Sequence, residues 1–464
     1  MITVLIAFRQ PPVGRSGPAS LSRKLRPQPH VLEDTPDDSR ILNGSFGITI
    51  YKMIPDIPIL IVGAQLSGLS AAYHLHNEGI NKDDIYFFDA LIKGKASQNW
   101  IPGTQGPELP RHTKFVSVPD DSSYSSLSHS RILKMGAQQY LRLKRNGVWL
   151  QREIAEAFNK NLVRNLGTVV LSNPKDENKL LEEFHLYKEL GFESTLNEFN
   201  QESIERVFST SEKSFTRGLF VPDDFIIDIE GYVNALASLL PETHFLNGHI
   251  VDKIEDRTDH VIVDYSIKHR TGDQIKIEKQ QPITAGKVVF ATNGFFVDSN
   301  LRHLLRQYWN YVLCFKDEGK NTPNAFYFGR NGHYFTRQDN ILIVGGEDTL
   351  VDKNEFSIPN NRDQALEKLL NWSNETFPKL SGTKPLGDHY GVFCETVDNL
   401  PIVGKFDTQR NVYYIVGCNG DGQSALSYSA YLLPAIMGIR KPRSKDEKDY
   451  IDLISPNRPT LRPR

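Results

Sequence analysis

The sequence predicts an α/β fold in which a parallel sheet is combined with a second, β-rich unit. Short apolar runs at 59–62, 85–88 and 288–290 are typical of parallel strands that are buried on both faces. A glycine-rich turn and a proline-free helix join the first two runs, which makes a β-α-β unit. Runs rich in β-branched and aromatic residues, each bounded by turn residues, indicate another sheet at 167–171, 325–328, 332–336 and 341–346.

The composition is that of a globular enzyme and excludes several classes of partner. The 464 residues suggest two or three domains, and the hydrophobic content of 39% is enough for a packed interior. Because 54 basic residues nearly balance 56 acidic ones, no broad field attracts nucleic acid or an anionic membrane. The three cysteines lack CxxC spacing, so we expect no disulfide framework, no metal site and an intracellular, cytoplasmic setting. No apolar run approaches the ~18 residues that span a bilayer, so no membrane anchor is expected.

Both ends of the chain differ from its middle. Residues 1–54 are rich in proline and basic residues and hold no acidic residue before Glu33, which predicts a disordered extension. The same composition fits an organelle-targeting segment, although the prolines would break the amphipathic helix that such segments form. The proline-rich segment 441–464 is predicted to be an extended surface tail.

The β-α-β unit carries a dinucleotide-binding fingerprint. The strand at 59–62 stops at Gly63, the turn ends at Gly68, and the helix that follows closes before Gly79. Asp89 ends the next strand about 20 residues beyond the last turn glycine, where a carboxylate accepts hydrogen bonds from an adenosine ribose. In such a Rossmann-like unit, the amide groups at the helix N-terminus bind the diphosphate.

Gln65 stands where the fingerprint has a second glycine. That glycine lets the backbone approach the diphosphate, so a glutamine side chain must point away or crowd the ligand. On steric grounds we expect Gln65→Gly to leave affinity equal or better, and Gly63→Val to abolish binding. A loss of about tenfold in Gln65→Gly would instead identify the glutamine as a ligand. A purely structural turn, or a decayed domain without catalysis, is the alternative.

A second glycine-rich turn lies near the end of the chain. The strand-like run 411–416 leads into the turn 417–422, and 423–437 is predicted to be a helix. The dipole of that helix would stabilise the negative charge at the N1/O2 edge of a reduced flavin, which favours a flavin over a nicotinamide cofactor. A plain helix-start loop is the alternative. Between the two turns, another buried strand at 287–294 ends in small residues, where a backbone passes close to a cofactor.

These segments resemble the D-amino-acid oxidase, glycine oxidase and sarcosine oxidase family of FAD-dependent oxidoreductases over about residues 57–437. The matching segments are 63–68 with Asp89, 218–224 with the helix 231–239, 288–294, 391–404 and 417–422. The resemblance implies a Rossmann-like FAD-binding domain assembled from 55–130, 224–295 and 385–440. It also implies an interleaved α+β substrate domain, with a large and mainly antiparallel sheet, from 131–223 and 296–384.

The resemblance also implies which residues bind FAD. Val251 matches a residue whose backbone faces adenine, and Ser97 matches a hydroxyl near the phosphates. FAD is expected to be non-covalent, because the cysteine that holds it in some relatives aligns with Gly391. The implied set is Gly63, Gln65, Leu66, Ser67, Gly68, Asp89, Ser97, Val251, Thr292, Gly391, Asp398, Gly417, Gly420, Gly422 and Gln423.

The reaction that the resemblance implies is oxidation of a C–N bond of an amine or amino acid. Hydride transfer to flavin N5 gives an imine and needs no dedicated acid or base, so no catalytic residue is assigned. Oxidation of a C–O or another C–H bond stays an alternative. The electron acceptor also stays open among oxygen, a quinone and an electron-transfer protein.

The residues expected around the substrate differ from those of amino-acid-oxidising relatives. The arginine of glycine oxidase aligns with Phe393 and the lysine of sarcosine oxidase aligns with Ser424, so two carboxylate-binding groups are missing. Asp421 is either an acid that attracts a cationic amine or a capping aspartate. Tyr334 is a further candidate, and Arg337 would supply the missing cation if it turned inward. We therefore expect amines, or amino compounds with a distant carboxylate or none, to be preferred over simple α-amino acids.

Overall fold

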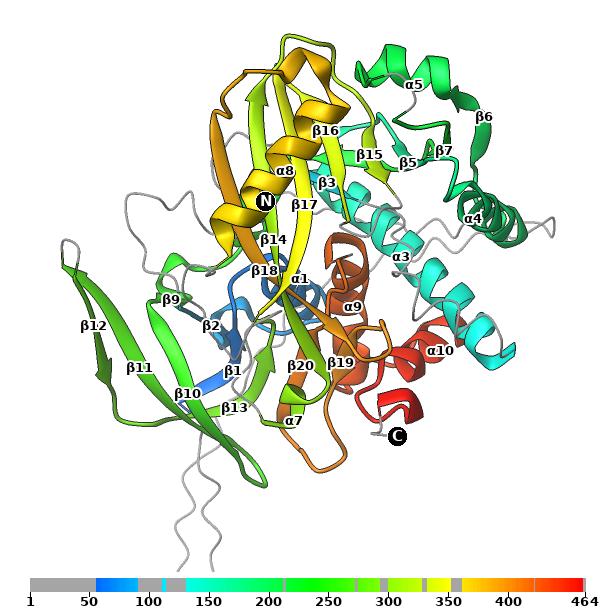
Figure 1. The fold of residues 1–464 in the computed structure, drawn as a ribbon. Helices are drawn as coiled ribbons and strands as arrows, with labels where there is room; N and C mark the ends of the chain where they lie inside the picture. The colour runs from blue at the N-terminus through cyan, green and yellow to red at the C-terminus, as the bar shows by residue number, and fades with distance from the viewer. Residues whose placement is uncertain are drawn as a thin grey trace, which may run out of the picture. The chain divides into compact units, whose positions relative to one another are not determined.

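Two large sheets organise the protein in the computed structural model (Figure 1). Among the described residues, the first sheet has nine strands and the second has eight. A small third sheet joins β3 (Arg111–Thr113), β4 (Val163–Arg164) and β8 (Phe225–Ile227). The structure describes residues 56–90, 111–113, 131–211, 214–271, 274–292, 299–327, 332–351, 361–420 and 422–461.

The first sheet has five parallel strands at its centre, in the order β20, β13, β1, β2 and β9. In β1, Ile59 and Ile61 pack into one hydrophobic core and Leu60 and Val62 into another, because successive side chains point to opposite faces. The antiparallel strands β10, β11 and β12 extend the sheet as an arm (Figure 1). The strands are β1 (Ile57–Val62), β2 (Ile85–Asp89), β9 (Phe245–Asn247), β10 (His249–Asp256), β11 (Val261–Thr271), β12 (Gln274–Lys279), β13 (Ile283–Phe290), β19 (Ile402–Gly404) and β20 (Val412–Val416).

The second sheet is antiparallel except where β5 meets β15. Its order is β18, β14, β17, β16, β15, β5, β7 and β6. Alternate residues of β14, including Trp309 and Phe315, pack under α8 (Arg362–Thr376), which lies across this sheet in Figure 1. The strands are β5 (Thr168–Ser172), β6 (Thr195–Asn200), β7 (Arg217–Val221), β14 (Leu305–Lys316), β15 (Asn324–Tyr327), β16 (Tyr334–Gln338), β17 (Ile341–Leu350) and β18 (Gly387–Thr396).

Helices α1 (Leu66–Asn77) and α9 (Gly422–Ile436) pack together against the first sheet, and α3 (Arg131–Phe158) packs on α9. α3 comes so close to α9 that a Cβ on Gly147 would lie 1.9 Å from the Ser424 carbonyl oxygen, so only glycine fits there. Besides α8, the α-helices of the described residues are α1 (Leu66–Asn77), α3 (Arg131–Phe158), α4 (Glu177–Leu190), α5 (Gln201–Phe208), α6 (Ile229–Ala237), α7 (Ser299–Arg302), α9 (Gly422–Ile436) and α10 (Lys445–Ile454).

The predicted α/β class, with a parallel sheet and a mainly antiparallel one, is confirmed. Two segments contact elements that lie on the other side of a predicted domain boundary. β18 pairs with β14 in the second sheet, although the boundary at 385 assigned it to the FAD-binding domain. α3 packs mainly on α9, although the segment 131–223 was assigned to the substrate domain. The described residues form part of one compact unit, Met53–Arg464, and the division into two domains stays a prediction.

The C-terminal segment is not the extended surface tail that its prolines suggested. α10 begins after Ser444, whose hydroxyl oxygen accepts a hydrogen bond from the Glu447 amide at 3.1 Å. Tyr450 and Ile454 of this helix are buried in the core beside α9. The prolines of this segment therefore flank a packed helix, where they interrupt no helical hydrogen bond.

Several predictions concern residues outside the described ranges and stay predictions. These residues are the extension 1–54, Ser97, the two residues after Thr292, and Asp421. Within the described part of the chain, no helix has both the length and the apolar content that crossing a membrane requires.

Candidate active site

Two glycines shape the turn between β1 and α1. Gly63 has a φ of +103°, and its amide donates a hydrogen bond to the Phe88 carbonyl oxygen at 2.8 Å. A Cβ on Gly63 would lie 2.6 Å from the Ala291 carbonyl oxygen, and a Cβ on Gly68 would lie 2.0 Å from the Gly63 carbonyl oxygen. Both positions therefore require glycine, as the fingerprint predicts.

Asp89 lies beside this turn. Its side chain is buried at the end of β2, and Oδ2 accepts a hydrogen bond from the Ala64 amide at 2.8 Å. The carboxylate is therefore held next to the residues that begin α1, and Ser67 is buried in the first turn of that helix. This is the arrangement in which an acidic side chain and a helix N-terminus share one dinucleotide.

Unpaired polar atoms gather at the same edge of the sheet. Both Nε2 and Oε1 of Gln65 are buried and have no hydrogen-bond partner among the described residues. The hydroxyl of Thr292, which follows β13, is likewise buried and unpaired within the described ranges. β1 and β13 are neighbouring parallel strands, so these residues follow the carboxyl ends of adjacent strands. Buried polar groups are almost always paired, and these groups fit a polar ligand such as the diphosphate of a dinucleotide.

The second glycine-rich turn follows β20, which is parallel to β13, at this edge. Three of its residues have a left-handed backbone conformation, with φ of +80° at Gly417, +49° at Asn419 and +78° at Gly420. The Asn419 amide donates to the Cys394 carbonyl oxygen at 2.9 Å, which fastens the turn to the end of β18. α9 begins at Gly422, so Gln423 and Ser424 lie in its first turn.

Other residues of the predicted FAD-binding set lie in α1, in β10 and in the second sheet. Leu66 is the first residue of α1. Val251 is buried in β10 at a register shift, opposite Tyr265 of β11, and Gly391 lies opposite Asn310 in the second sheet. Whether these positions contact a cofactor stays a prediction.

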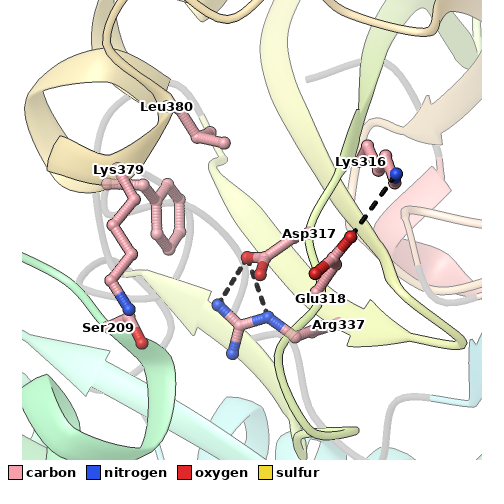
Figure 2. A pocket seen from close by; sticks show the side chains of 8 residues that line it. Ser209, Lys316, Asp317, Glu318, Arg337, Lys379 and Leu380 are labelled. Atoms are coloured by element: carbon pink, nitrogen blue, oxygen red, sulfur yellow. Dashed lines mark hydrogen bonds and ion pairs between the residues drawn. The ribbon is translucent and has the colours of Figure 1, made fainter.

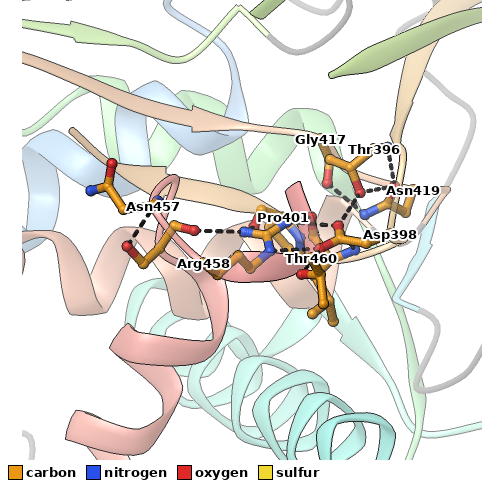
Figure 3. Close-up of polar contacts among 10 residues, drawn as sticks. Thr396, Asp398, Pro401, Gly417, Asn419, Asn457, Arg458 and Thr460 are labelled. Atoms are coloured by element: carbon orange, nitrogen blue, oxygen red, sulfur yellow. Dashed lines mark hydrogen bonds and ion pairs between the residues drawn. The ribbon is translucent and has the colours of Figure 1, made fainter. Parts of the chain in front are cut away.

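Asp398 was expected to bind the cofactor, but in the structure its carboxylate is engaged by the C-terminal segment. The Arg458 guanidinium donates from Nε to Oδ2 at 2.7 Å and from Nη2 to Oδ1 at 2.8 Å (Figure 3). Burial raises the pKa of Asp398, but the hydrogen bonds and charge of Arg458 outweigh it and hold that pKa below its usual value. Asp398 is therefore an ionised member of a structural ion pair.

Tyr334 and Phe393 lie on one face of the second sheet and pack against the core that includes α9. The Tyr334 ring lies over Gly345, where a Cβ would come within 2.1 Å of the ring, so this glycine makes room for it. The Tyr334 hydroxyl donates to Asn310 Oδ1 at 3.0 Å, and Asn310 Nδ2 donates to Asp348 Oδ1 at 2.7 Å. Polar groups therefore lie on the face that points toward the glycine-rich turns.

Arg337 does not turn inward. It is three residues beyond Tyr334 in β16, so strand alternation places it on the opposite face, beside α8 and Phe335. Its Nη2 is 2.7 Å from Asp317 Oδ2 and donates to the Phe208 carbonyl oxygen at 3.2 Å. Figure 2 shows this pair beside a cavity of about 180 Å³ whose lining includes Lys379. Arg337 is thus a structural arginine and supplies no cation to the Tyr334 face.

Sequence reasoning missed the residues of β14 on this face. Tyr308 stacks on Phe393, with ring centroids 5.6 Å apart, and Arg306 precedes Tyr308 by two residues in β14. Arg306, Tyr308 and Asn310 alternate along one strand, and this period was visible in the sequence. The pattern alone does not indicate a site, because no glycine-rich turn adjoins β14.

Comparison with solved structures finds the same fold in several proteins. The chain covers 98% of a glycine oxidase from Geobacillus kaustophilus, which covers 86% of this chain at 14% identity with a TM-score of 0.62. An L-proline dehydrogenase from P. horikoshii matches at 15% identity, with 87% and 98% of the two chains covered and a TM-score of 0.63. An iminodiacetate oxidase from Chelativorans sp. matches at 15% identity, with 86% and 98% covered and a TM-score of 0.59.

A search among curated proteins gave no match. The family model DAO, described as FAD dependent oxidoreductase, matches residues 58–434, which include both glycine-rich turns. The solved structures share the fold, and the family model covers most of the chain. The chain therefore belongs to the DAO family of FAD-dependent oxidoreductases.

Proposed function

We propose that this chain binds FAD non-covalently and oxidises the C–N bond of an amine or amino acid. The observation that carries the proposal is the shared edge of β1, β13 and β20, where two glycine turns meet buried polar atoms of Gln65 and Thr292. When bound, FAD supplies the oxidant that accepts the hydride from the substrate carbon. The substrate nitrogen loses a proton, and the C–N single bond becomes an imine.

The residues present suit the two halves of the cofactor. The amides that begin α1 would hold the diphosphate, with Gln65 and Thr292 as side-chain partners and Asp89 facing the ribose. The N-terminus of α9, after Gly417 and Gly420, would stabilise negative charge on the reduced flavin.

The cysteines near the second turn favour non-covalent binding. Cys394 is fully buried, and its thiol pKa is raised well above the usual value by burial and by the neighbouring Cys418. A thiol must ionise to attack a flavin, so Cys394 is a poor attachment point. The purified protein should be yellow, and acid precipitation should leave all flavin in the supernatant. Flavin that stays with the pellet would show a covalent bond, and colourless protein that cannot take up FAD would overturn the assignment.

For the substrate, we propose an amine or an amino compound whose carboxylate is distant or absent. Phe393 stacks on Tyr308 where a carboxylate-binding arginine stands in glycine oxidase, and Arg337 is already paired with Asp317. The polar groups beside Tyr334 are the amide of Asn310 and the carboxylate of Asp348, which suit an amino group better than a carboxylate. Arg306 lies on the same face of β14 as Tyr308 and Asn310. Its guanidinium could bind a substrate carboxylate, so it is the residue to test against the proposed amine preference.

The test compares anaerobic flavin reduction by glycine, sarcosine, D-alanine and a series of mono- and diamines. We expect the amines to reduce the flavin fastest, Arg306→Met to change their rates less than twofold, and Asp421→Asn to slow them. Fast reduction by a small α-amino acid that is lost in Arg306→Met would identify Arg306 as a carboxylate ligand and contradict the amine preference.

A further inference from the structure

The C-terminal segment contains a buried arginine, Arg458, that binds an internal loop. The side chains of Arg458 and Asp398 are 5% and 9% exposed, and their two hydrogen bonds form a bidentate pair. The Thr460 hydroxyl also donates to Asp398 Oδ2. The two charged or hydroxyl side chains that bind this carboxylate from the C-terminal segment lie about 60 positions later in the chain, and they add to local hydrogen bonds from Thr396 and Leu400.

Arg458 also binds the backbone of the same loop. Its Nη2 donates to the Leu400 carbonyl oxygen at 2.7 Å, and its Nη1 donates to the Pro401 carbonyl oxygen at 2.8 Å (Figure 3). A third backbone contact, from Nη1 to the Ser455 carbonyl oxygen at 3.1 Å, ties the guanidinium to its own segment. One guanidinium therefore fixes both the side chain and the backbone of 398–401.

From Asp398 the hydrogen bonds continue to the second glycine turn. The Thr396 hydroxyl donates to Asp398 Oδ1 at 3.2 Å, and the Thr396 amide donates to Asn419 Oδ1 at 2.7 Å. Asn419 Nδ2 in turn donates to the Gly417 carbonyl oxygen at 2.9 Å. Figure 3 shows this chain of contacts from Arg458 to the turn.

The turn needs such support. Asn419 has a φ of +49°, a conformation that L-residues adopt rarely, and Gly417 and Gly420 also have positive φ. Backbone in sparsely populated conformations persists only where its surroundings hold it in place. The side chain of Asn419 is held at both polar atoms, because Oδ1 accepts a hydrogen bond from the Thr396 amide and Nδ2 donates one to the Gly417 carbonyl oxygen.

We propose that Arg458 is a positioning residue for the flavin-binding turn. It acts through Asp398 and Thr396 to hold Asn419, and so sets the conformation in which the turn and the start of α9 receive the isoalloxazine ring of FAD. The proposal rests on the function proposed above. It makes the C-terminal segment a part of the cofactor site.

The test compares Arg458→Met with a matched variant, Arg440→Met. Arg440 is also a buried C-terminal arginine, with a side chain 9% exposed, an ion pair to Glu447 at 2.7 Å and a hydrogen bond to the Tyr431 carbonyl oxygen at 3.1 Å. It contacts Tyr431 on α9, Glu447 on α10, Glu78 and the Lys441 carbonyl oxygen, and none of these belongs to the loop 398–401. Both variants lose a buried ion pair, but only Arg458→Met disconnects the turn.

The first measurement is the affinity of the apoprotein for FAD, followed by quenching of flavin fluorescence. The second is hydrogen exchange of the amides of 415–422 in the apoprotein, which needs no bound flavin. We expect Arg458→Met to weaken FAD binding about tenfold or more and to speed exchange in the turn about tenfold. Arg440→Met should change both by less than about twofold, even though its melting temperature falls. Arg458→Lys should restore part of the affinity.

Thr396→Val covers the case in which Arg458→Met fails to fold. It leaves the ion pair intact and removes the hydroxyl that joins Asp398 to the turn, so exchange in 415–422 should still increase. Unchanged exchange and affinity in a folded Arg458→Met, or equal losses in Arg440→Met, would overturn the positioning role. Wild-type protein that binds no FAD would instead defeat the proposed function, while the exchange data would still decide whether Arg458 holds the turn.

Discussion

Gln65 offers the sharpest test of how the first turn binds its ligand. Steric reasoning from the sequence expects Gln65→Gly to bind FAD as well as the wild type or better. The structure changes this expectation, because both polar atoms of the amide are buried without a partner among the described residues. Gln65 has an extended backbone, with φ of −97° and ψ of −171°, so glycine is not required there for conformational reasons.

The magnitude follows from the groups at stake. A hydrogen bond from the Gln65 amide to a charged phosphate oxygen contributes about 1.5–3 kcal/mol, or roughly 10- to 100-fold in affinity. Glycine is well accepted at the N-cap position that Gln65 occupies, so α1 should keep its stability. Removing a buried, unpaired amide should even raise the unfolding free energy of the apoprotein, by about 1 kcal/mol. We therefore expect weaker FAD binding in a variant that is at least as stable.

The assay is titration of apoprotein with FAD, together with urea unfolding of the apoprotein. Gln65→Met is the matched control, because it keeps the side-chain volume and removes the amide. If the amide is a ligand, the Met and Gly variants should lose affinity alike. Equal or tighter binding by Gln65→Gly, with weak binding by Gln65→Met, would refute the ligand role and support simple crowding.

Three further predictions follow from the geometry. Gly68→Ala should weaken FAD binding at least about 100-fold, because its Cβ would lie 2.0 Å from a backbone oxygen, and a normal dissociation constant would contradict this. Gly345→Val should displace the Tyr334 ring and slow flavin reduction by substrate about tenfold, while FAD affinity measured by titration stays within twofold. Burial, then the charges of Arg440 and Arg443, lowers the pKa of His74 from 6.5 to about 3. The unfolded chain therefore takes up the proton first, and the unfolding free energy should fall below pH 6.5, by about 2 kcal/mol near pH 5. His74→Gln should lack this component in acid-dependent urea unfolding, and an unchanged pH profile would show that another group is responsible.

The first turn could be predicted from sequence because its determinants are local. β1, α1 and β2 follow one another within 35 residues, Gly63 has a positive φ, and the contact that requires glycine at 68 is with Gly63 itself. The strand pairs of the second sheet are harder to predict, because they join distant parts of the chain. β14, for example, pairs with β18, which lies about 80 residues later. Such pairing leaves only a period-two pattern in the sequence, and that pattern does not say which face meets the cofactor.

The C-terminal helix could have been found from the sequence. Ser444 and Glu447 have the spacing of a capping box, and the Glu447 amide does donate to the Ser444 hydroxyl oxygen. The prolines at 442 and 456 suggest an extended tail, but they lie just outside α10, where proline is tolerated. Proline content alone therefore does not separate a tail from a short helix with proline at both ends.

The carboxylate of Asp398 has a partner that the sequence did not reveal, and whether Asp398 also contacts the cofactor stays a prediction. Its segment was matched to the one beneath the flavin, but an unpaired carboxylate there would oppose the negative charge that a reduced flavin carries. Arg458 cancels that charge, and no feature of 391–404 itself reveals a partner some 60 residues away. If the second turn receives the flavin as proposed, this ion pair would both hold the loop and keep it electrically neutral. On this argument Arg458→Met should lower the reduction potential of whatever FAD it still binds, whereas a loss of packing alone would weaken binding without a directed change in potential.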